Sequence, residues 1–252
     1  MMSSGPHTWD NAISTLVPAV LRVLRKMKRC WWDAITGTTL SVTLADTVDA
    51  VTVPRAADGQ HFVREDWYGD DLGAAHFVEC TFTDVDLSET TTSGATFERC
   101  TFHGGRFNAS VHTATAFVGC DFRRTSFFDA TFDGCKLVGS VLAECTVRPL
   151  TVVGGSWLGV TIRGSNLSRL DLTGVDLREA DLSMSDLTLT VLARARLDHA
   201  VLREANLDRA DLRGASLDGV DLSVARLKRT RLDVAGAVLL AELHGADVDP
   251  AS

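Results

Sequence analysis

Cysteine, histidine and acidic side chains are the groups in this chain that could do chemistry, and their spacing does not favour catalysis. The seven histidines are scattered, and no HExxH, GxSxG or glycine-rich phosphate loop is present. Thiolate metal sites use close CxxC pairs or nearby histidines, and the cysteines have neither. The sequence therefore predicts no catalytic residues, no metal site and no cofactor, and a protein that is not an enzyme.

The cysteines are spaced by multiples of five. Five of the six follow this spacing: Cys80, Cys100, Cys120, Cys135 and Cys145. A disulfide framework is typical of small secreted domains, whereas free cysteines behave as small core residues. We interpret these five as core residues of a protein in the reducing cytoplasm. The start of the chain lacks the basic region of a signal peptide, and no apolar run is long enough to span a membrane.

Acidic side chains between residues 171 and 221 could bind a basic partner. The candidates are Asp171, Asp176, Glu179, Asp181, Asp186, Asp211 and Asp221. A strip of such carboxylates repels nucleic acid and attracts a basic groove, so the sequence predicts a protein partner and no direct nucleic-acid binding. A structural alternative remains for each Asp, because Asp before Leu also stabilises turns through its own side chain.

A five-residue repeat positions all of these groups, from about residue 61 to residue 232. Every fifth residue from Phe62 to Leu232 is Leu or Phe, except at Trp67, Thr92, His112, Val147, Val152, Trp157 and Ile162. Two residues before each of them the side chain is small from Ala75 onward, with Leu150 and Leu170 as exceptions. A period of five fits neither a helix nor a simple strand. It predicts a chain that turns a corner every five residues and buries one large side chain per side.

Two irregular positions in the repeat have structural interpretations. His112 occupies a slot where Leu is expected, in the same column as Thr92, and we interpret the two as a tolerated buried polar pair. Gly154 and Gly155 precede Trp157, and we interpret them as space for the large indole.

The pentads Ala-Asn-Leu-Asp-Arg (205–209) and Ala-Asp-Leu-Arg-Gly (210–214) resemble the A-[DN]-L-x-x motif of the pentapeptide-repeat family. The resemblance covers roughly two thirds of the chain. It implies an all-β solenoid, a right-handed quadrilateral β-helix with four pentapeptides per coil. Asp211 and Asp221 would then share the columns of Asp171 and Asp181. With coils about 4.8 Å apart, residues 62–232 would form about 8.5 coils and a rod about 41 Å long.

Composition predicts three segments: an N-terminal extension of residues 1–60, the repeat at 61–232, and a C-terminal segment at 233–252. In the extension, residues 13–32 are apolar and then basic. Two interpretations remain open for them: a cap over the first coil, or a basic amphipathic helix that lies on a membrane. The cap is the simpler one, and the alternation at residues 40–44 indicates a strand within it.

The last segment predicts a short helix that covers the last coil and joins two copies of the chain. Asp233 suits its N-cap and Gly245 its C-terminal cap. One apolar face can cover the coil, and a neighbouring face is left for a second copy. We therefore expect a homodimer whose contact includes Val234, Val238, Leu239, Leu240 and Leu243.

Residues 137–152 (LVGSVLAECTVRPLTV) and the tail RLDVAGAVLLAELHG resemble members of the family that confer quinolone resistance. That resemblance implies an acidic dimeric rod that mimics B-form DNA. It implies binding to the A subunit of DNA gyrase, inhibition of that enzyme and protection from quinolones. An alternative from another class is a structural or adaptor solenoid, membrane-associated through residues 13–32.

Charge limits the idea of DNA mimicry. About 41 Å of duplex carries roughly 24 phosphates. Residues 61–233 carry 25 acidic and 19 basic groups, a net charge of only −6. The sequence therefore predicts that shape, length and a local acidic strip provide much of the recognition.

Overall fold

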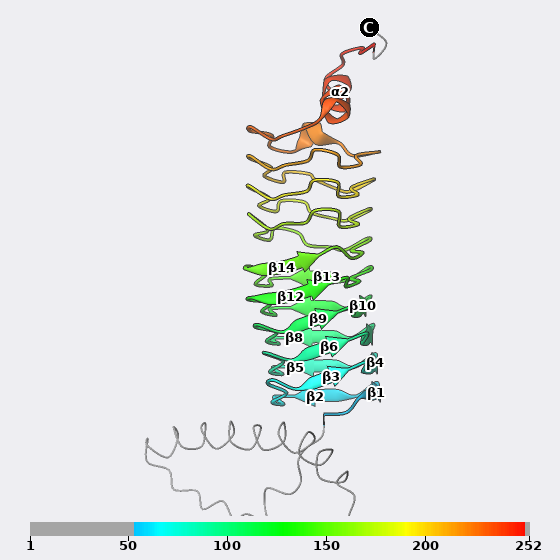
Figure 1. Cartoon of the computed structure of the whole chain (residues 1–252), viewed down its shortest axis with the longest axis vertical. Helices are drawn as coiled ribbons and strands as arrows, with labels where there is room; N and C mark the ends of the chain where they lie inside the picture. The colour runs from blue at the N-terminus through cyan, green and yellow to red at the C-terminus, as the bar shows by residue number, and fades with distance from the viewer. Residues whose placement is uncertain (1–52, 250–252) are drawn as a thin grey trace, which may run out of the picture. The chain divides into compact units, whose positions relative to one another are not determined.

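The computed structural model describes residues 53–249 as a four-sided column of stacked coils followed by a short helix (Figure 1). These residues belong to one compact unit that begins at Val53. The predictions for residues 13–32 and 40–44 lie outside the described residues. Ala56 already pairs in the stack, so the coils extend before the predicted boundary at residue 61.

Short strands form the first part of the column. They are β1 (Ala56–Asp58), β2 (His61–Val63), β3 (Asp71–Gly73), β4 (His76–Val78), β5 (Thr81–Thr83), β6 (Thr91–Ser93), β7 (Thr96–Glu98), β8 (Thr101–His103), β9 (Val111–Thr113), β10 (Ala116–Val118), β11 (Asp121–Arg123), β12 (Ala130–Asp133), β13 (Val141–Ala143) and β14 (Leu150–Val153). They make three parallel sheets, ordered β1-β4-β7-β10, β2-β5-β8-β11-β13 and β3-β6-β9-β12-β14.

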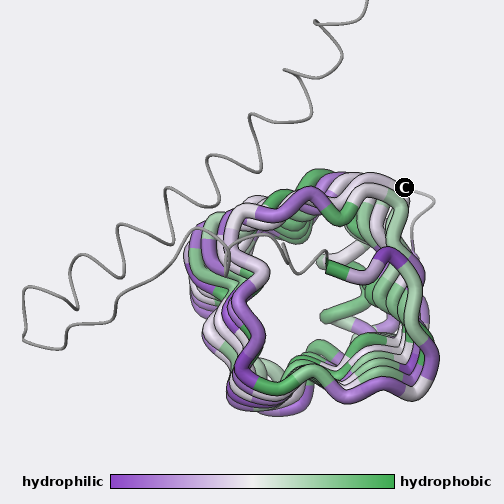
Figure 2. Tube along the Cα trace, turned by 90° about the horizontal axis from the view of Figure 1, so that it is seen from below, coloured by the Kyte–Doolittle hydropathy of each residue, from purple (hydrophilic) through white to green (hydrophobic). Residues whose placement is uncertain are grey.

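The register between coils confirms the predicted quadrilateral β-helix. Paired residues lie twenty positions apart, as Phe62 and Phe82 do, except at Gly73, which pairs with Thr92. Beyond β14 the same register continues as isolated parallel bridges, of which the last joins Asp211 to Arg231. Viewed along the column, the chain traces a square (Figure 2). One coil is therefore four pentapeptides, one for each side.

We number the sides in chain order. Side 1 carries β1-β4-β7-β10 and side 2 carries β2-β5-β8-β11-β13. Side 3 is held by bridges alone, from Asp66–Asp86 to Asn206–Arg226. Side 4 carries β3-β6-β9-β12-β14.

The repeat's large residues fill the interior and are buried. Phe stacks directly on Phe in the early coils: the ring centroids of Phe82 and Phe102 are 4.6 Å apart, and those of Phe102 and Phe122 are 4.7 Å apart. The rings within each pair are nearly parallel, at 7° and 8°. From Leu137 onward Leu takes over most of these slots. Each added coil thus extends one continuous apolar core, which makes the stack stable beyond a single coil.

The last residue of each pentapeptide turns the corner in the left-handed conformation. Arg64 has φ 56° and Arg229 has φ 57°, and the same slot is left-handed in nearly every pentad between them. Side chains reach this conformation at a cost of roughly 1–2 kcal/mol, which explains why glycine is frequent there. Pro149, whose ring fixes φ near −65°, interrupts the series, and the peptide bond before it is cis.

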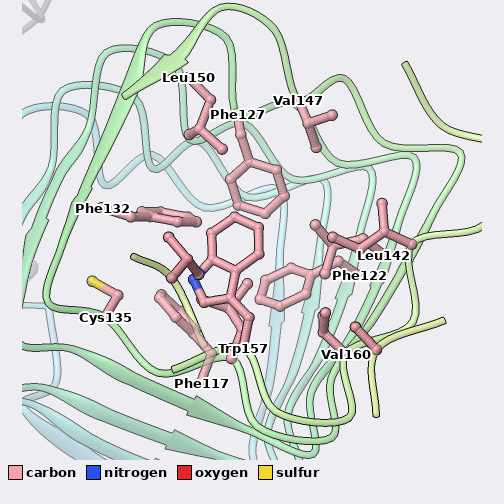
Figure 3. Close-up of a cluster of buried hydrophobic side chains, with 14 of the residues drawn as sticks. Phe117, Phe122, Phe127, Phe132, Cys135, Leu142, Val147, Leu150, Trp157 and Val160 are labelled. Carbon is pink, nitrogen blue, oxygen red and sulfur yellow. The ribbon is translucent and has the colours of Figure 1, made fainter. Parts of the chain in front are cut away.

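Glycine is required at position 155 for a reason other than the predicted space for the Trp157 indole. A Cβ built on it would lie 2.2 Å from the Cys135 carbonyl oxygen, and its φ is +97°. The close neighbour is therefore the backbone of the coil below, not the Trp157 indole. Figure 3 shows that indole inside the column, surrounded by Phe and Leu side chains, with its nitrogen edge toward Cys135. Trp157 is 1% exposed.

His112 lies in a buried hydroxyl cluster, which extends the predicted pair with Thr92. Its Nδ1 is 2.7 Å from Thr92 Oγ1 and its Nε2 is 2.9 Å from Ser110 Oγ. Thr92 Oγ1 also lies 2.6 Å from Thr115 Oγ1. Ser110 donates its own hydroxyl to the Phe107 carbonyl, so it accepts from the imidazole. A neutral imidazole with its proton on Nε2 satisfies every member of the cluster.

The column ends in a 3₁₀ turn, η2 (Leu222–Val224), and a helix, α2 (Val234–Leu243). The predicted N-cap is confirmed, because the Asp233 carboxylate accepts from the Gly236 N–H at 3.0 Å. Gly245 follows the helix with φ +84°, and its N–H donates to the Glu242 carbonyl. The Ala246 N–H reaches back to Ala241, so the helix stops in a Schellman motif.

Candidate partner-binding surface

The predicted acidic strip is not a strip. Bridges place Asp171 and Asp211 on side 4, Asp176 on side 1 and Asp181 on side 2, while Asp186 lies on side 3. Five residues along the chain correspond to one corner of the square, so consecutive carboxylates face four directions. Among residues at equivalent positions of different pentads, only those separated by a multiple of twenty share a side.

The remaining two candidates lie at less regular positions. Glu179 is a left-handed corner residue at the end of its side 1 pentad. Asp221 has the column of Asp181 by register, but it caps η2 at the end of the stack. The seven candidates therefore surround the column and do not form one face.

The aspartates that precede the inward Leu also have the structural role that remained open. Asp171 Oδ1 accepts from the backbone N–H of Thr173 at 3.0 Å, and Asp186 Oδ1 accepts from that of Thr188 at the same distance. Asp181, Asp211 and Asp221 repeat the arrangement with the residue two positions later. Asn166 does so as well, with Ser168. The charge is therefore not needed for this turn, since an amide oxygen serves equally.

Arginines bind two of the candidates through paired hydrogen bonds, and Arg163 lies 3.4 Å from a third, Asp181. Arg178 contacts both carboxylate oxygens of Asp176 at 2.8 Å, and Arg213 contacts both of Asp211 at 2.8 and 2.7 Å. The Arg178 hydrogen bond lowers the pKa of Asp176, and the Arg213 hydrogen bond lowers the pKa of Asp211 to about 2. A basic partner would have to compete with these paired arginine hydrogen bonds, so Asp176 and Asp211 are the candidates least available to it.

Two carboxylates that the sequence did not single out join Glu179 on side 1. The Glu179 N–H donates to the Asp198 carbonyl, and the His199 N–H donates to the Asp218 carbonyl. Glu179, Asp198 and Asp218 therefore lie on three successive coils, and we call them the side 1 acidic run. The register of twenty joins Asp198 to Asp218, but Glu179 lies nineteen residues before Asp198, so its place beside them follows only from the hydrogen bond between the coils.

The predicted dimer residues divide between two environments. Leu239 and Leu240 pack against the end of the core. Val234 is 80% exposed and Leu243 is 38% exposed, and Val238 is half-buried. Gly236 lets the helix approach closely, because a Cβ there would lie 3.1 Å from the Leu232 side chain. One face of α2 thus covers the last coil and leaves an apolar face, with Val224 of η2 also exposed.

Three of the inward thiols are hydrogen-bonded between coils. Cys120, Cys135 and Cys145 donate to main-chain carbonyls of the previous coil. Burial raises the pKa of Cys135 and of Cys145 to about 11, so both stay protonated. Within residues 53–249, no three His, Cys, Asp or Glu side chains are arranged to hold a metal ion. A membrane-spanning helix is likewise absent from that part of the chain.

Comparison with known proteins identifies the repeat. A family model described as pentapeptide repeats matches residues 71–108, 113–142, 159–194 and 195–233. The pentapeptide repeat protein MfpA of Mycobacterium tuberculosis is 41% identical over 101 residues, which cover 38% of this chain and 55% of MfpA. The match thus spans about half the length of that curated relative.

Solved structures support the fold. A trypsin-treated variant of QnrB1, a plasmid-mediated fluoroquinolone resistance protein, has a TM-score of 0.60 at 19% identity, covering 77% of this chain and 97% of its own. Full-length QnrB1 has a TM-score of 0.54 at 18% identity, covering 76% and 100%. At these identities the likeness concerns the fold.

Proposed function

Because the chain belongs to the pentapeptide-repeat family, we propose that it binds DNA gyrase in place of DNA. The A subunit's DNA-binding groove would hold the column, and occupation of that groove would inhibit supercoiling and protect the enzyme from quinolone-type poisons. The protein acts by binding and catalyses no reaction. The observation that carries the proposal is the 41% identity to MfpA, found in a chain whose coils expose carboxylates on every side.

The distribution of charge supports recognition by shape together with a local acidic surface. Residues 61–233 carry a net charge of −6, far below a duplex of equal length. Among the acidic groups, the side 1 acidic run presents three carboxylates along the column axis. Asp218 is strongly exposed, with 85% of its side chain accessible. We propose this run as the main acidic contact with the basic groove.

We also propose that two copies join through α2. Val234 and Leu243 expose apolar surface on a ten-residue helix whose only charged side chain is Glu242. A helix that is apolar on nearly all sides is normally buried. The last coil covers only one face, and a second copy related by a two-fold axis would cover the other.

Variants in which acidic side chains are replaced by their uncharged amides test the gyrase proposal. E179Q/D198N/D218N removes three negative charges from side 1, whereas D171N/D181N/D186N removes three from the other sides. D171N, D181N and D186N keep the turn hydrogen bond, as Asn166 already does. D198N retains one oxygen that can accept from Ser216 Oγ. Urea unfolding of both variants checks that the fold is kept. We expect the side 1 variant to inhibit supercoiling at least about tenfold less well, and the matched variant to retain most of its inhibition.

The supercoiling assay, run with and without a quinolone, tests the proposed function of the wild-type protein. No inhibition and no protection by the wild-type protein at micromolar concentrations would refute it. Equal losses in the two variants would assign recognition to total charge and not to side 1. An adaptor function would then be favoured if the protein sediments with liposomes through residues 13–32.

A further inference from the structure

The end of the column carries a basic cluster that the gyrase proposal does not use. Arg226, Lys228 and Arg229 flank the inward Leu227 on side 3 of the last coil, and we call them the basic end coil. All three are exposed, and within residues 53–249 none of them forms an ion pair. Arg209 lies one coil below, where its N–H donates to the Lys228 carbonyl. Cations concentrated at one end of an otherwise acidic column are suited to an anionic partner.

Acidic groups lie at the C-terminal end of α2 and just after it. Glu242 is in its last turn and Asp247 follows it, and both side chains are exposed. In the described part of the chain, neither Glu242 nor Asp247 forms an ion pair. We call Glu242 and Asp247 the acidic tail.

Helix α2 separates the two groups within one copy. Its ten residues are about 15 Å long. Figure 1 shows α2 standing beyond the last coil, with the described residues that follow it farther from the coils. The Schellman motif at Gly245 fixes the direction in which the tail leaves the helix. The tail of one copy therefore points away from its own basic end coil.

A second copy brings them together. If two α2 helices pack side by side about a two-fold axis that is perpendicular to them, they run antiparallel, and the end of each helix lies at the start of the other. The start of α2 adjoins the last coil, because Asp233 accepts from the Gly214 N–H at 2.7 Å. Each acidic tail would thus meet the basic end coil of the other copy, and symmetry would make the contact twice.

We propose that the acidic tail of each copy binds the basic end coil of a second copy. This electrostatic clasp rests on the α2 dimer proposed above and adds to its apolar contact. The apolar face supplies affinity, whereas the clasp sets the antiparallel direction, because a parallel pair would place tail beside tail. Exposed ion pairs are weak singly and are screened by salt, so the clasp should matter most at low ionic strength.

Charge reversal tests the clasp by sedimentation equilibrium of the full chain. R226E/R229E places acidic groups at both contact points, and E242R/D247R does the same with basic groups. We expect each variant alone to dimerise at least about tenfold more weakly at low salt. An equimolar mixture should recover wild-type affinity, because both contacts of the mixed dimer are again complementary. R203E, which replaces an exposed arginine on side 2, serves as the matched control and should change little.

Each other outcome overturns the clasp in a distinguishable way. Unchanged dimer affinity in both reversals means that α2 joins the copies without it. Loss of affinity without recovery in the mixture means that the charges act elsewhere. If R226E/R229E instead abolishes a gel shift of duplex DNA and leaves the dimer intact, the basic end coil binds nucleic acid. Gyrase inhibition, measured separately on the same proteins, decides the proposed function independently of these results.

Discussion

At the residue scale, His112 couples the stability of the column to pH. Burial lowers the pKa of His112 to about 3, against an ordinary value of 6.5. The unfolded chain therefore binds a proton between these values that the folded chain does not. Unfolding free energy should be fully present above about pH 6.5 and should fall as the pH drops towards 3. The contribution of His112 to this slope is at most about 1.4 kcal/mol per pH unit.

Denaturant titrations at several pH values check this prediction. Between pH 6.5 and about 5 most carboxyl groups remain ionised in both states, so the slope there reports mainly on histidines. T92L/H112L restores the repeat's Leu in both slots and leaves Ser110 its bond to the Phe107 carbonyl. We expect this variant to fold and to lose much of the slope. An unchanged slope in the variant would show that other groups cause it.

Single side chains were predictable where the repeat constrains them. The inward Leu and Phe slots and the small slots followed from the period, because a narrow interior admits one large side chain per side. The sequence shows a glycine at position 155, but it does not show why a glycine is required there. The reason is a contact with the Cys135 backbone, twenty residues earlier, and a linear sequence does not show how closely two coils approach there.

At the element scale, Asp233 connects α2 to the column as well as capping it. One carboxylate oxygen accepts from Gly236 and the other from Gly214, and the Gly236 bond lowers the pKa of Asp233. D233A removes both hydrogen bonds and should lower the urea concentration at the midpoint of unfolding measurably. D233N retains one acceptor oxygen and should lower it less. Urea unfolding at a fixed protein concentration measures both, and equal losses would contradict the two-bond account.

The sides of the square explain why the acidic surface was harder to predict than the fold. The sequence places five acidic residues between positions 171 and 186. A chain that turns a corner at every pentad spreads them around the column, whereas the side 1 acidic run is dispersed over forty residues of sequence. Grouping residues by the side of the square on which their pentads lie, and not by nearness in sequence, recovers the surface. Arginines such as Arg178 and Arg213 also neutralise some of the aspartates, and these ion pairs are visible only in the structure.

At the scale of the whole molecule, the coil stack follows from the repeat, but its ends do not. Each coil makes the same contacts as its neighbours, so one rule predicts them all. At the ends the rule stops: Ala56 joins the stack outside the repeat's clear register, and α2 covers the last coil through Gly236, a position the apolar pattern did not mark. The ends are therefore where experiments on assembly are most informative.

Salt dependence distinguishes this column from the nucleic acid it would replace. Duplex DNA carries a condensed layer of counterions, and a protein that makes six to ten phosphate contacts loses roughly 10³–10⁵ in affinity between 50 and 200 mM salt. A column with a net charge of −6 over residues 61–233 has far fewer counterions to release. The affinity of the column for the gyrase A subunit should therefore fall much less over the same range. Because the affinity of DNA falls more steeply, the protein should displace DNA from the subunit more effectively as the salt concentration rises. Fluorescence anisotropy with labelled protein and labelled duplex gives the two slopes. Equal slopes would mean that the groove recognises a polyanion, and that shape contributes little.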